Sequence, residues 1–199
     1  MKKIIFSLTL CVILIPCSLG QFSRIGAGAA YNYEVFFHGS LDDDKLLSPI
    51  FFLTGIYEIS LPFHLSPSIN AYFPNVVKIE EVDYSYKWVT TGFSFDIDGH
   101  YVINSFDRLE VFGLLGLNIL VASQKYTESG IGLPEPIRER ITNASLGANI
   151  GVGAYIKIKE HVDLSLRIKA ILADQIQFMV STGVLVNIDM LSKGRNSGY

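Results

Sequence analysis

The chain has almost no cysteine: of its 199 residues only Cys11 and Cys17 carry a thiol, and both lie near the N-terminus. From residue 21 onward there is none, so no disulfide can form in that part of the chain. If the protein is exported, its fold must therefore be held by hydrogen bonds and packing alone. This excludes the small secreted scaffolds that depend on disulfides.

Long apolar runs are also scarce, and the one candidate lies at the N-terminus. Lys2 and Lys3 precede an apolar stretch at 4–16, and the small residues Ser18 and Gly20 follow at the −3 and −1 positions of a cleavage site after residue 20. A basic start, a short apolar stretch and a small-residue cleavage site are the features of a secretory signal peptide, and the stretch is too short for a spanning helix. We therefore predict a signal peptide at 1–20 and one mature domain at 21–199.

Positive charge is in deficit. Without Lys2 and Lys3, 14 basic residues stand against 19 acidic ones, a net charge of −5. This balance argues against nucleic acid as a partner, because nucleic-acid binding needs a basic surface. Mean hydropathy is nevertheless high, at +0.35, although no apolar run after residue 20 could form a spanning helix. Strands that face lipid on one side and a polar interior on the other give this combination.

The stretch 144–158 shows what these strands look like. Every second residue is apolar, and the residues between them are small, polar or charged. A strand sends alternate side chains to opposite faces, so one face of this stretch is apolar along its whole length. It is longer than the ~5–6 residues of a typical globular strand and suits a tilted strand of ~9–11 residues that crosses a bilayer.

Similar alternation marks seven other stretches. The predicted strands are 24–35, 51–63, one beginning near 69, 88–103, 109–122, 144–158, 164–172 and 177–189. A turn is predicted at 66–68, the segment 75–87 is a loop or strand beyond the membrane, and the longest connection is predicted at 123–140. The prediction is an all-β, eight-stranded antiparallel up-and-down transmembrane β-barrel. A soluble secreted β-sandwich is the alternative.

Charged residues fall on the faces that would point into the lumen. These positions are Arg24, Glu34, Glu58, Asp96, Glu110, Lys157, Arg167 and Lys169. Eight strands enclose a lumen that side chains fill, and buried charges must pair because an isolated one is very costly. We therefore predict a salt-bridge network that closes the pore, with a proton or ion path as the alternative.

Aromatic residues gather near the predicted strand ends. They are Tyr31, Tyr33, Tyr57, Phe63, Phe73, Trp88, Tyr101 and Phe106. Facing outward, they would form the aromatic girdles that lie at the two membrane interfaces of a barrel. In a β-sandwich they would be ordinary core residues.

Few residues suggest chemistry. The acidic run 42–44 is typical of a solvated loop, the four histidines have no metal-ligand spacing, and no cofactor is implied. His64 and Ser66 lie two residues apart, the spacing found in outer-membrane lipid A deacylases. The pair falls in the predicted turn beside Pro67, on the periplasmic side, away from the outer leaflet. An enzyme acting on outer-leaflet lipid is therefore a minor alternative.

The last predicted strand carries the most specific pattern. Ser181, Gly183, Val186 and Ile188 follow the order polar residue, glycine, then alternate hydrophobic residues. This resembles the insertion signal of the OmpX/OmpA-like group of small eight-stranded outer-membrane barrels of Gram-negative bacteria. Two departures are that neither Val186 nor Ile188 is aromatic and that a polar tail continues from about 190.

The resemblance implies a location, partners and a function. The location would be the bacterial outer membrane, and the partners would be its lipid, lipopolysaccharide and the barrel assembly machinery that recognises the last strand. The expected function is non-enzymatic: envelope integrity, or adhesion and partner binding through the outer loops of a plugged or narrow barrel. A porin-like pore for small solutes is a further alternative. A shared fold cannot choose among these functions.

Overall fold

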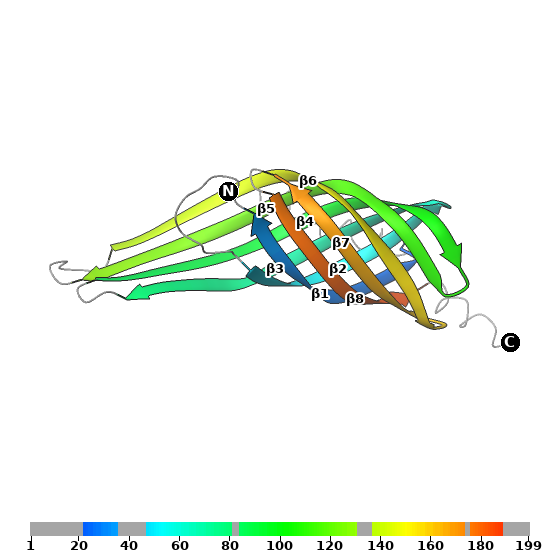
Figure 1. Ribbon diagram of the computed structural model, residues 1–199, viewed down its shortest axis with the longest axis horizontal. Coiled ribbons are helices and arrows are strands. Elements are labelled where there is room, and N and C mark those ends of the chain that lie inside the picture. The colour runs from blue at the N-terminus through cyan, green and yellow to red at the C-terminus, as the bar shows by residue number, and fades with distance from the viewer. Residues whose placement is uncertain (1–21, 36–46, 81–83, 131–136, 174–175, 189–199) are drawn as a thin grey trace, which may run out of the picture.

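Eight antiparallel strands close into a barrel in the computed structural model (Figure 1). Each strand pairs with its neighbours in the chain, and β1 pairs with β8 to complete the ring. The structure describes residues 22–35, 47–80, 84–130, 137–173 and 176–188. The strands are β1 (Arg24–Val35), β2 (Leu47–Ser60), β3 (Phe63–Glu80), β4 (Tyr84–Phe106), β5 (Leu109–Gly130), β6 (Ile137–Lys159), β7 (Val162–Leu172) and β8 (Ile176–Asn187). The predicted fold class is confirmed.

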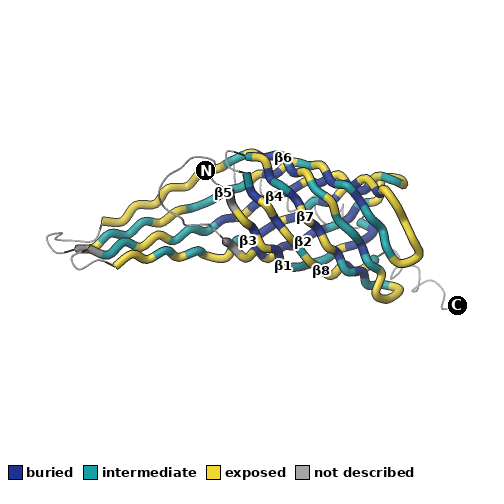
Figure 2. The backbone as a smooth tube through the Cα atoms, in the orientation of Figure 1, coloured by how far each residue is buried: buried dark blue, intermediate teal, exposed yellow. Residues whose placement is uncertain are grey.

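Side chains alternate between the lumen and the outer surface, as the sequence pattern predicted. Along β6, Leu146 and Ile150 are more than half exposed, whereas Asn149 and Tyr155 are almost fully buried. Figure 2 shows the same alternation around the barrel. Apolar side chains from the other strands also point outward, among them Phe51, Leu53, Phe93, Leu117, Ile168 and Val180. An apolar outer band of this kind suits the hydrocarbon of a bilayer.

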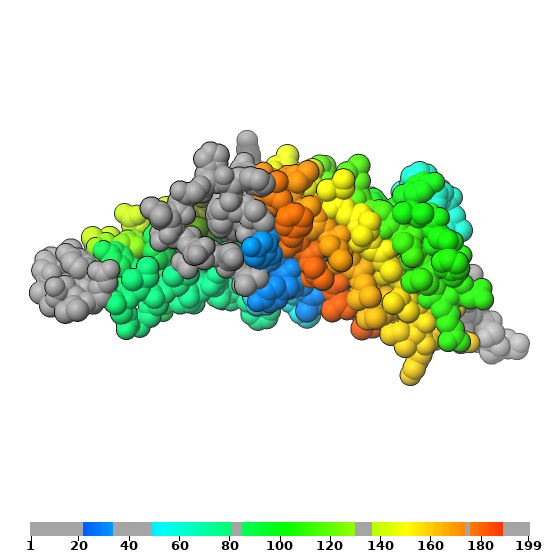
Figure 3. Space-filling model, viewed as in Figure 1, coloured from blue at the N-terminus to red at the C-terminus, as the bar shows by residue number. Residues whose placement is uncertain are grey.

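Four consecutive strands are longer than the other four. β3 to β6 have 18 to 23 residues, whereas β1, β2, β7 and β8 have 11 to 14. β3 to β6 remain paired with one another past the rim as a four-stranded sheet. Figure 1 shows these strands projecting beyond the barrel, and Figure 3 shows the same projection in the space-filling view. We call this sheet the extension; it comprises residues 75–80, 84–91, 123–130 and 137–142. The opposite end of the barrel carries the turns at 61–62, 107–108 and 160–161, and we call it the short-turn end.

The extension corrects two predicted connections. Most of 75–87 is strand, which is the second of the two alternatives considered for it. The predicted connection at 123–140 is wrong, because β5 continues to Gly130 and β6 begins at Ile137. The apolar alternation that marks a strand comes from lipid on one face. Strands that project beyond the lipid lose this alternation while their backbones remain paired.

The turn between β2 and β3 is also placed differently from the prediction. The turn is at Leu61 and Pro62, and residues 66–68 lie within β3. Pro67 cannot donate a backbone hydrogen bond, and the β2–β3 pairing is interrupted beside it, between Thr54 and Tyr57. A proline in a strand is tolerated at such an interruption. At the other end of the chain, β8 ends at Asn187, two residues earlier than predicted.

Glycines on the lumen side make room for large side chains. A Cβ atom on Gly153 would collide with the ring of Phe112, and one on Gly183 would lie 2.8 Å from the ring of Phe52. The small lumen-side residues of β6 and β8 therefore have a packing role: they let two aromatic rings cross the interior.

Three predicted features lie outside the described residues: the signal peptide at 1–20, the acidic run at 42–44 and the polar tail from about 190. Within the described ranges, no helix is long and apolar enough to cross a membrane.

Candidate functional site

Arg24 is the centre of an ion cluster at the short-turn end of the lumen. Its guanidinium lies 3.0 Å from Glu58, 3.1 Å from Glu110 and 3.4 Å from Asp163. The three carboxylates come from β2, β5 and β7, so one arginine on β1 connects four strands. Charge-assisted hydrogen bonds of this kind are stronger than neutral ones.

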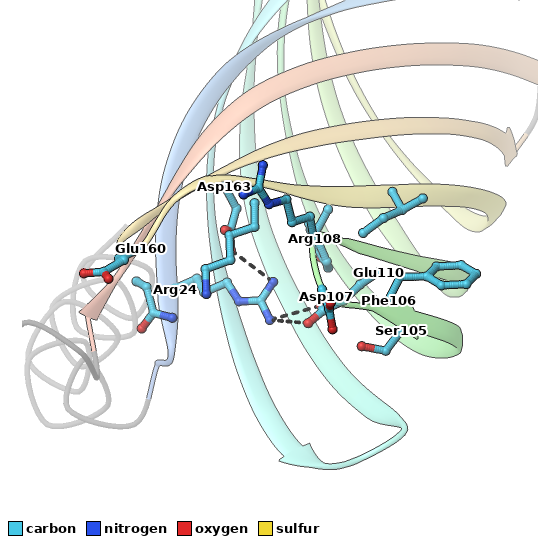
Figure 4. Close-up of a pocket in the computed structure, with 12 residues that line it drawn as sticks. Arg24, Ser105, Phe106, Asp107, Arg108, Glu110, Glu160 and Asp163 are labelled. Carbon is cyan, nitrogen blue, oxygen red and sulfur yellow. Dashed lines mark hydrogen bonds and ion pairs between the residues drawn. The ribbon is translucent and has the colours of Figure 1, made fainter.

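A cavity of about 380 Å³ opens beside this cluster (Figure 4). Arg24 reaches across it to Glu110 and Asp163, and the β4–β5 turn contributes Asp107 and Arg108 to its wall. Charges of both signs line the cavity. This distribution favours internal pairing over binding of a single charged ligand.

An apolar layer lies further into the lumen. His100, Phe112 and Tyr155 form its stack: the imidazole of His100 lies 4.3 Å from the ring of Phe112, which lies 4.5 Å from the ring of Tyr155. The Tyr155 hydroxyl is 2.7 Å from Nδ1 of His100, so these two polar atoms bond to each other, whereas Nε2 of His100 has no hydrogen-bond partner among the described residues. The buried apolar members of this layer are Ile56, Val102, Phe112, Leu114, Tyr155 and Leu185.

A second ion cluster occupies the middle of the lumen. The Lys169 ammonium lies 2.6 Å from Asp96 and 3.3 Å from Asp98. Amides from three other strands donate to the same carboxylates: Asn70 and Asn118 to Asp96, and Asn149 to Asp98. A buried charge network is stable when its members are satisfied in this way.

A second apolar layer lies on the other side of this network. The guanidinium of Arg167 stacks 4.9 Å above the ring of Phe52, and Arg167 forms no ion pair with a described residue. A cavity of about 10 Å³ beside Arg167 has room for about one water molecule. The layer consists of Ala30, Ile50, Phe52, Ile171 and Met179. Two apolar layers with an ion network between them therefore fill the lumen.

The structure brings together several of the charges predicted to face the lumen. Arg24 contacts Glu58 and Glu110, and Lys169 contacts Asp96. Lys157 is exposed at the cavity near the short-turn end. Arg167 is buried but stacks on a ring instead of pairing with a carboxylate. Glu34 lies on β1, and the structure does not describe its side chain.

Two members of the network were missed by sequence reasoning. Asp163 lies one residue before the predicted strand 164–172, and it shares its alternation with Ser165 and Arg167 and faces the lumen at the start of β7. Asp98 lies inside the predicted strand 88–103 and shares its alternation with Asp96. Extending the strand at 164 by one residue identifies Asp163, and applying the alternation to every charge of 88–103 identifies Asp98.

His64 and Ser66 do not form a catalytic pair. Both lie on β3 and are buried in the lumen near the short-turn end. The Ser66 hydroxyl is 3.1 Å from the Thr54 hydroxyl, and neither ring nitrogen of His64 has a hydrogen-bond partner among the described residues. A serine without a base and without access to lipid cannot attack an acyl chain. The predicted turn position of the pair is wrong, because the turn between β2 and β3 is at Leu61 and Pro62.

The predicted insertion signal spans the end of β8. Ser181 and Gly183 lie at lumen-side positions of β8, and Val186 is exposed on the outer surface. Ile188 lies one residue past the strand and donates its backbone N–H to the carbonyl oxygen of Ser23 at 2.8 Å. Recognition of this segment by the assembly machinery remains a prediction.

The two faces of the extension differ in chemistry. Trp88 was predicted to face outward in a girdle, but it shares its alternation with Asp96 on β4 and therefore lies on the lumen-side face. Tyr126 and Glu139 are in register with Trp88 on the same face. The opposite, outer face carries the basic residues of the extension: Lys78, Lys87, Lys125, Arg138 and Arg140. Six other predicted girdle residues are exposed on the barrel: Tyr31, Tyr33, Phe63, Phe73, Tyr101 and Phe106.

Metal binding has no support in the described part of the chain, where no three His, Cys, Asp or Glu side chains are arranged to hold an ion.

Comparison of sequences finds no relative: no protein-family model matches the chain, and no curated protein matches it. Comparison of structures finds small barrels. The attachment invasion locus protein Ail of Yersinia pestis aligns with a TM-score of 0.53 at 16% identity, over 82% of this chain and 95% of Ail. Neisserial surface protein A aligns with a TM-score of 0.50 at 15% identity, over 82% of this chain and 96% of that protein.

A third similar structure is a major outer membrane protein from Thermus thermophilus. It aligns with a TM-score of 0.53 at 11% identity, over 80% of this chain and 98% of that protein. At these identities the likeness concerns the fold, and it covers nearly the whole of each matched barrel. The chain therefore has the fold of the small eight-stranded outer-membrane β-barrels, as its sequence pattern predicted.

Proposed function

We propose that this protein is a non-enzymatic, non-conducting barrel of a bacterial outer membrane that presents the extension to a partner outside the cell. The observation that carries the proposal is the unequal strand length: in the described part of the chain, β3 to β6 project beyond the rim, whereas β1, β2, β7 and β8 end at it. A rigid paired sheet above a membrane is a binding platform that a barrel with short strands lacks.

The filled lumen argues against the pore alternative. A solute would have to displace two apolar layers and the Lys169 network between them, all built from side chains that are at most a few per cent exposed. Eight strands leave no wider passage around them. We expect no steady conductance when the protein is inserted in a planar bilayer.

The proposal includes the features of the chain that bear on export and assembly. Residues 1–20 would be removed as a signal peptide, and the barrel assembly machinery would recognise β8 through Ser181, Gly183, Val186 and Ile188. Lipid would contact the apolar outer band, and lipopolysaccharide would lie against the barrel at the level of the extension.

The test compares bacteria that display the wild-type protein with bacteria that display a trimmed variant. Asn75 pairs with Thr90 and Ser123 pairs with Thr142, so residues 76–89 and 124–141 can each be replaced by an Asn-Gly turn without changing the register below. Attachment to a panel of immobilised polypeptides and polysaccharides is then measured. Boiled and unboiled samples are compared by electrophoresis, because a folded barrel resists detergent until it is heated.

We expect the wild-type protein to promote attachment to at least one surface and the trimmed variant to lose it while keeping the heat-dependent shift. Equal attachment by the two would refute a binding function for the extension. A conducting wild-type protein would refute the closed lumen.

A further inference from the structure

The lumen-side face of the extension is aromatic and acidic. Tyr86, Trp88 and Tyr126 form one continuous aromatic surface: the rings of Trp88 and Tyr126 are 4.8 Å apart, and those of Tyr86 and Tyr126 are 6.2 Å apart. Trp88 is 41% exposed. Glu139 lies directly beside Tyr126 in the register, and Glu128 lies beside Tyr86.

All basic residues of the described extension are on its other face. Lys78 pairs in register with Lys87, and Lys125 pairs with Arg140. The side chains confirm the assignment of that face: Arg140 donates from Nε to the Ser123 hydroxyl at 3.0 Å. The two glutamates on the lumen-side face therefore have no lysine or arginine beside them among the described residues.

The aromatic surface cannot be a membrane anchor. Interfacial tyrosine and tryptophan lie on the lipid-facing side of a barrel strand, whereas Trp88 has the same alternation as the buried residues Asp96 and Asp98 of its strand. It lies beyond the rim and faces away from the bilayer. Its exposure to solvent therefore needs an explanation other than lipid.

We propose that the lumen-side face of the extension binds a cationic polypeptide segment, with an arginine or lysine side chain over the rings of Trp88 and Tyr126 and its charge paired to Glu139. Charge complementarity selects this partner. The face of an aromatic ring attracts a cation, tryptophan most strongly, and the two carboxylates add to the attraction. The same carboxylates repel an anionic glycan, which the basic outer face would suit instead. The proposal rests on the proposed function and names its partner class.

Trp88 gives a direct readout, because it is the only tryptophan in the chain. The mature protein is folded into nanodiscs of zwitterionic phosphatidylcholine, and its tryptophan emission is followed during titration with an octa-arginine peptide. We expect a saturable change in emission that weakens when NaCl is raised from about 0.05 M to about 0.5 M, because exposed charges are screened. Titration with the neutral oligosaccharide maltohexaose should leave the emission unchanged.

Two matched variants locate the binding. Glu139→Gln removes the charge beside Tyr126 and should raise the apparent Kd for octa-arginine by at least about threefold, a loss in the range of an exposed ion pair. Lys125→Gln changes one charge on the outer face of the same sheet and should leave the Kd unchanged or lower it. Both variants keep the hydrogen bond between Tyr126 and Glu128.

Each other result overturns the proposal. No emission change with octa-arginine would exclude a cationic partner on this face, and a response to maltohexaose alone would assign the face to a neutral glycan. Equal Kd values for the two variants would place the peptide elsewhere. A negative result in this titration would leave the proposed function intact. If the trimmed variant lost attachment to a surface, the extension would still be a binding platform, but for a partner of another class.

Discussion

The Lys169 ammonium lies 2.6 Å from a carboxylate oxygen of Asp96, and both side chains are almost completely buried. Lys169 is on β7 and Asp96 on β4, which do not pair, so the contact spans the lumen instead of joining neighbouring strands. Asp98 shares the same ammonium at 3.3 Å. One lysine therefore pairs with two carboxylates in the middle of the barrel, and amides from β3, β5 and β6 supply further hydrogen bonds to them.

Lys169→Met should destabilise the barrel by about 3–5 kcal/mol, because it leaves two carboxylates buried without a cation. The methionine keeps most of the side-chain volume, so the loss is electrostatic. Urea unfolding of the mature protein in lipid vesicles measures the change. Adding Asp96→Asn and Asp98→Asn to Lys169→Met should recover part of the stability. A midpoint for Lys169→Met equal to that of the wild type would show that the network is dispensable.

Gly153→Ala should destabilise the barrel by about 1–3 kcal/mol, the usual cost of overpacking. The added methyl group would collide with the Phe112 ring and lie 2.8 Å from the carbonyl oxygen of Leu166 on β7, so backbone as well as side chain must shift. The matched control is Ala154→Val, one residue along on the outer surface, where lipid can adjust. The same unfolding assay compares the two. Equal losses would mean that the lumen is looser at Phe112 than described.

The barrel could be predicted from sequence because lipid leaves a period of two in every strand it touches. The run from 144 to 158 shows this directly: Leu146, Ile150 and Val152 are exposed on the outer surface. Where lipid ends, the pattern ends too. The sequence therefore predicted only part of the extension: strand was one of two alternatives for 75–87, whereas 123–140 was predicted as a connection. Strand pairing there depends on backbone hydrogen bonds to a neighbouring strand, which leave no periodic pattern in the sequence.

The site was predictable as a set of positions but not as a set of contacts. Alternation alone puts Arg24, Asp96 and Lys169 on the lumen side. It does not say that Lys169 pairs with β4, because that depends on strand tilt and on glycines that let side chains cross. Arg167 shows the limit most clearly: its charge suggested an ion pair, whereas its guanidinium stacks on Phe52.

Ile150→Arg tests the position of the membrane. Ile150 is 52% exposed on the outer surface of β6, and an arginine there should cost about 2–4 kcal/mol if the residue is near the middle of the bilayer. Thr142→Arg is the control on the same strand and the same outer face: it lies in the extension, is also exposed, and should fold with wild-type yield. Folding yield in lipid vesicles compares them. Equal yields for the two variants would mean that the bilayer does not surround this part of β6.

Tyr126 should titrate well above an ordinary tyrosine. Partial burial, followed by the hydrogen bond that its hydroxyl donates to Glu128 at 2.8 Å, raises the pKa of Tyr126 to about 12 from the usual value of 10.0. The folded protein holds the proton more tightly than the unfolded chain, so this residue favours folding below pH 10 and loses that contribution as the pH rises from 10 towards 12.

The absorbance of tyrosinate, recorded for the wild type and for Tyr126→Phe, isolates this single titration by difference. Its midpoint should lie near pH 12, and Glu128→Gln should move it towards 10 by removing a negative charge that opposes ionisation. Glu139→Gln, which removes a second negative charge near the same ring, should move the midpoint in the same direction by less. A midpoint of 10 in the wild type would mean that the Tyr126–Glu128 bond is absent in solution, and the aromatic surface would then lack a fixed arrangement.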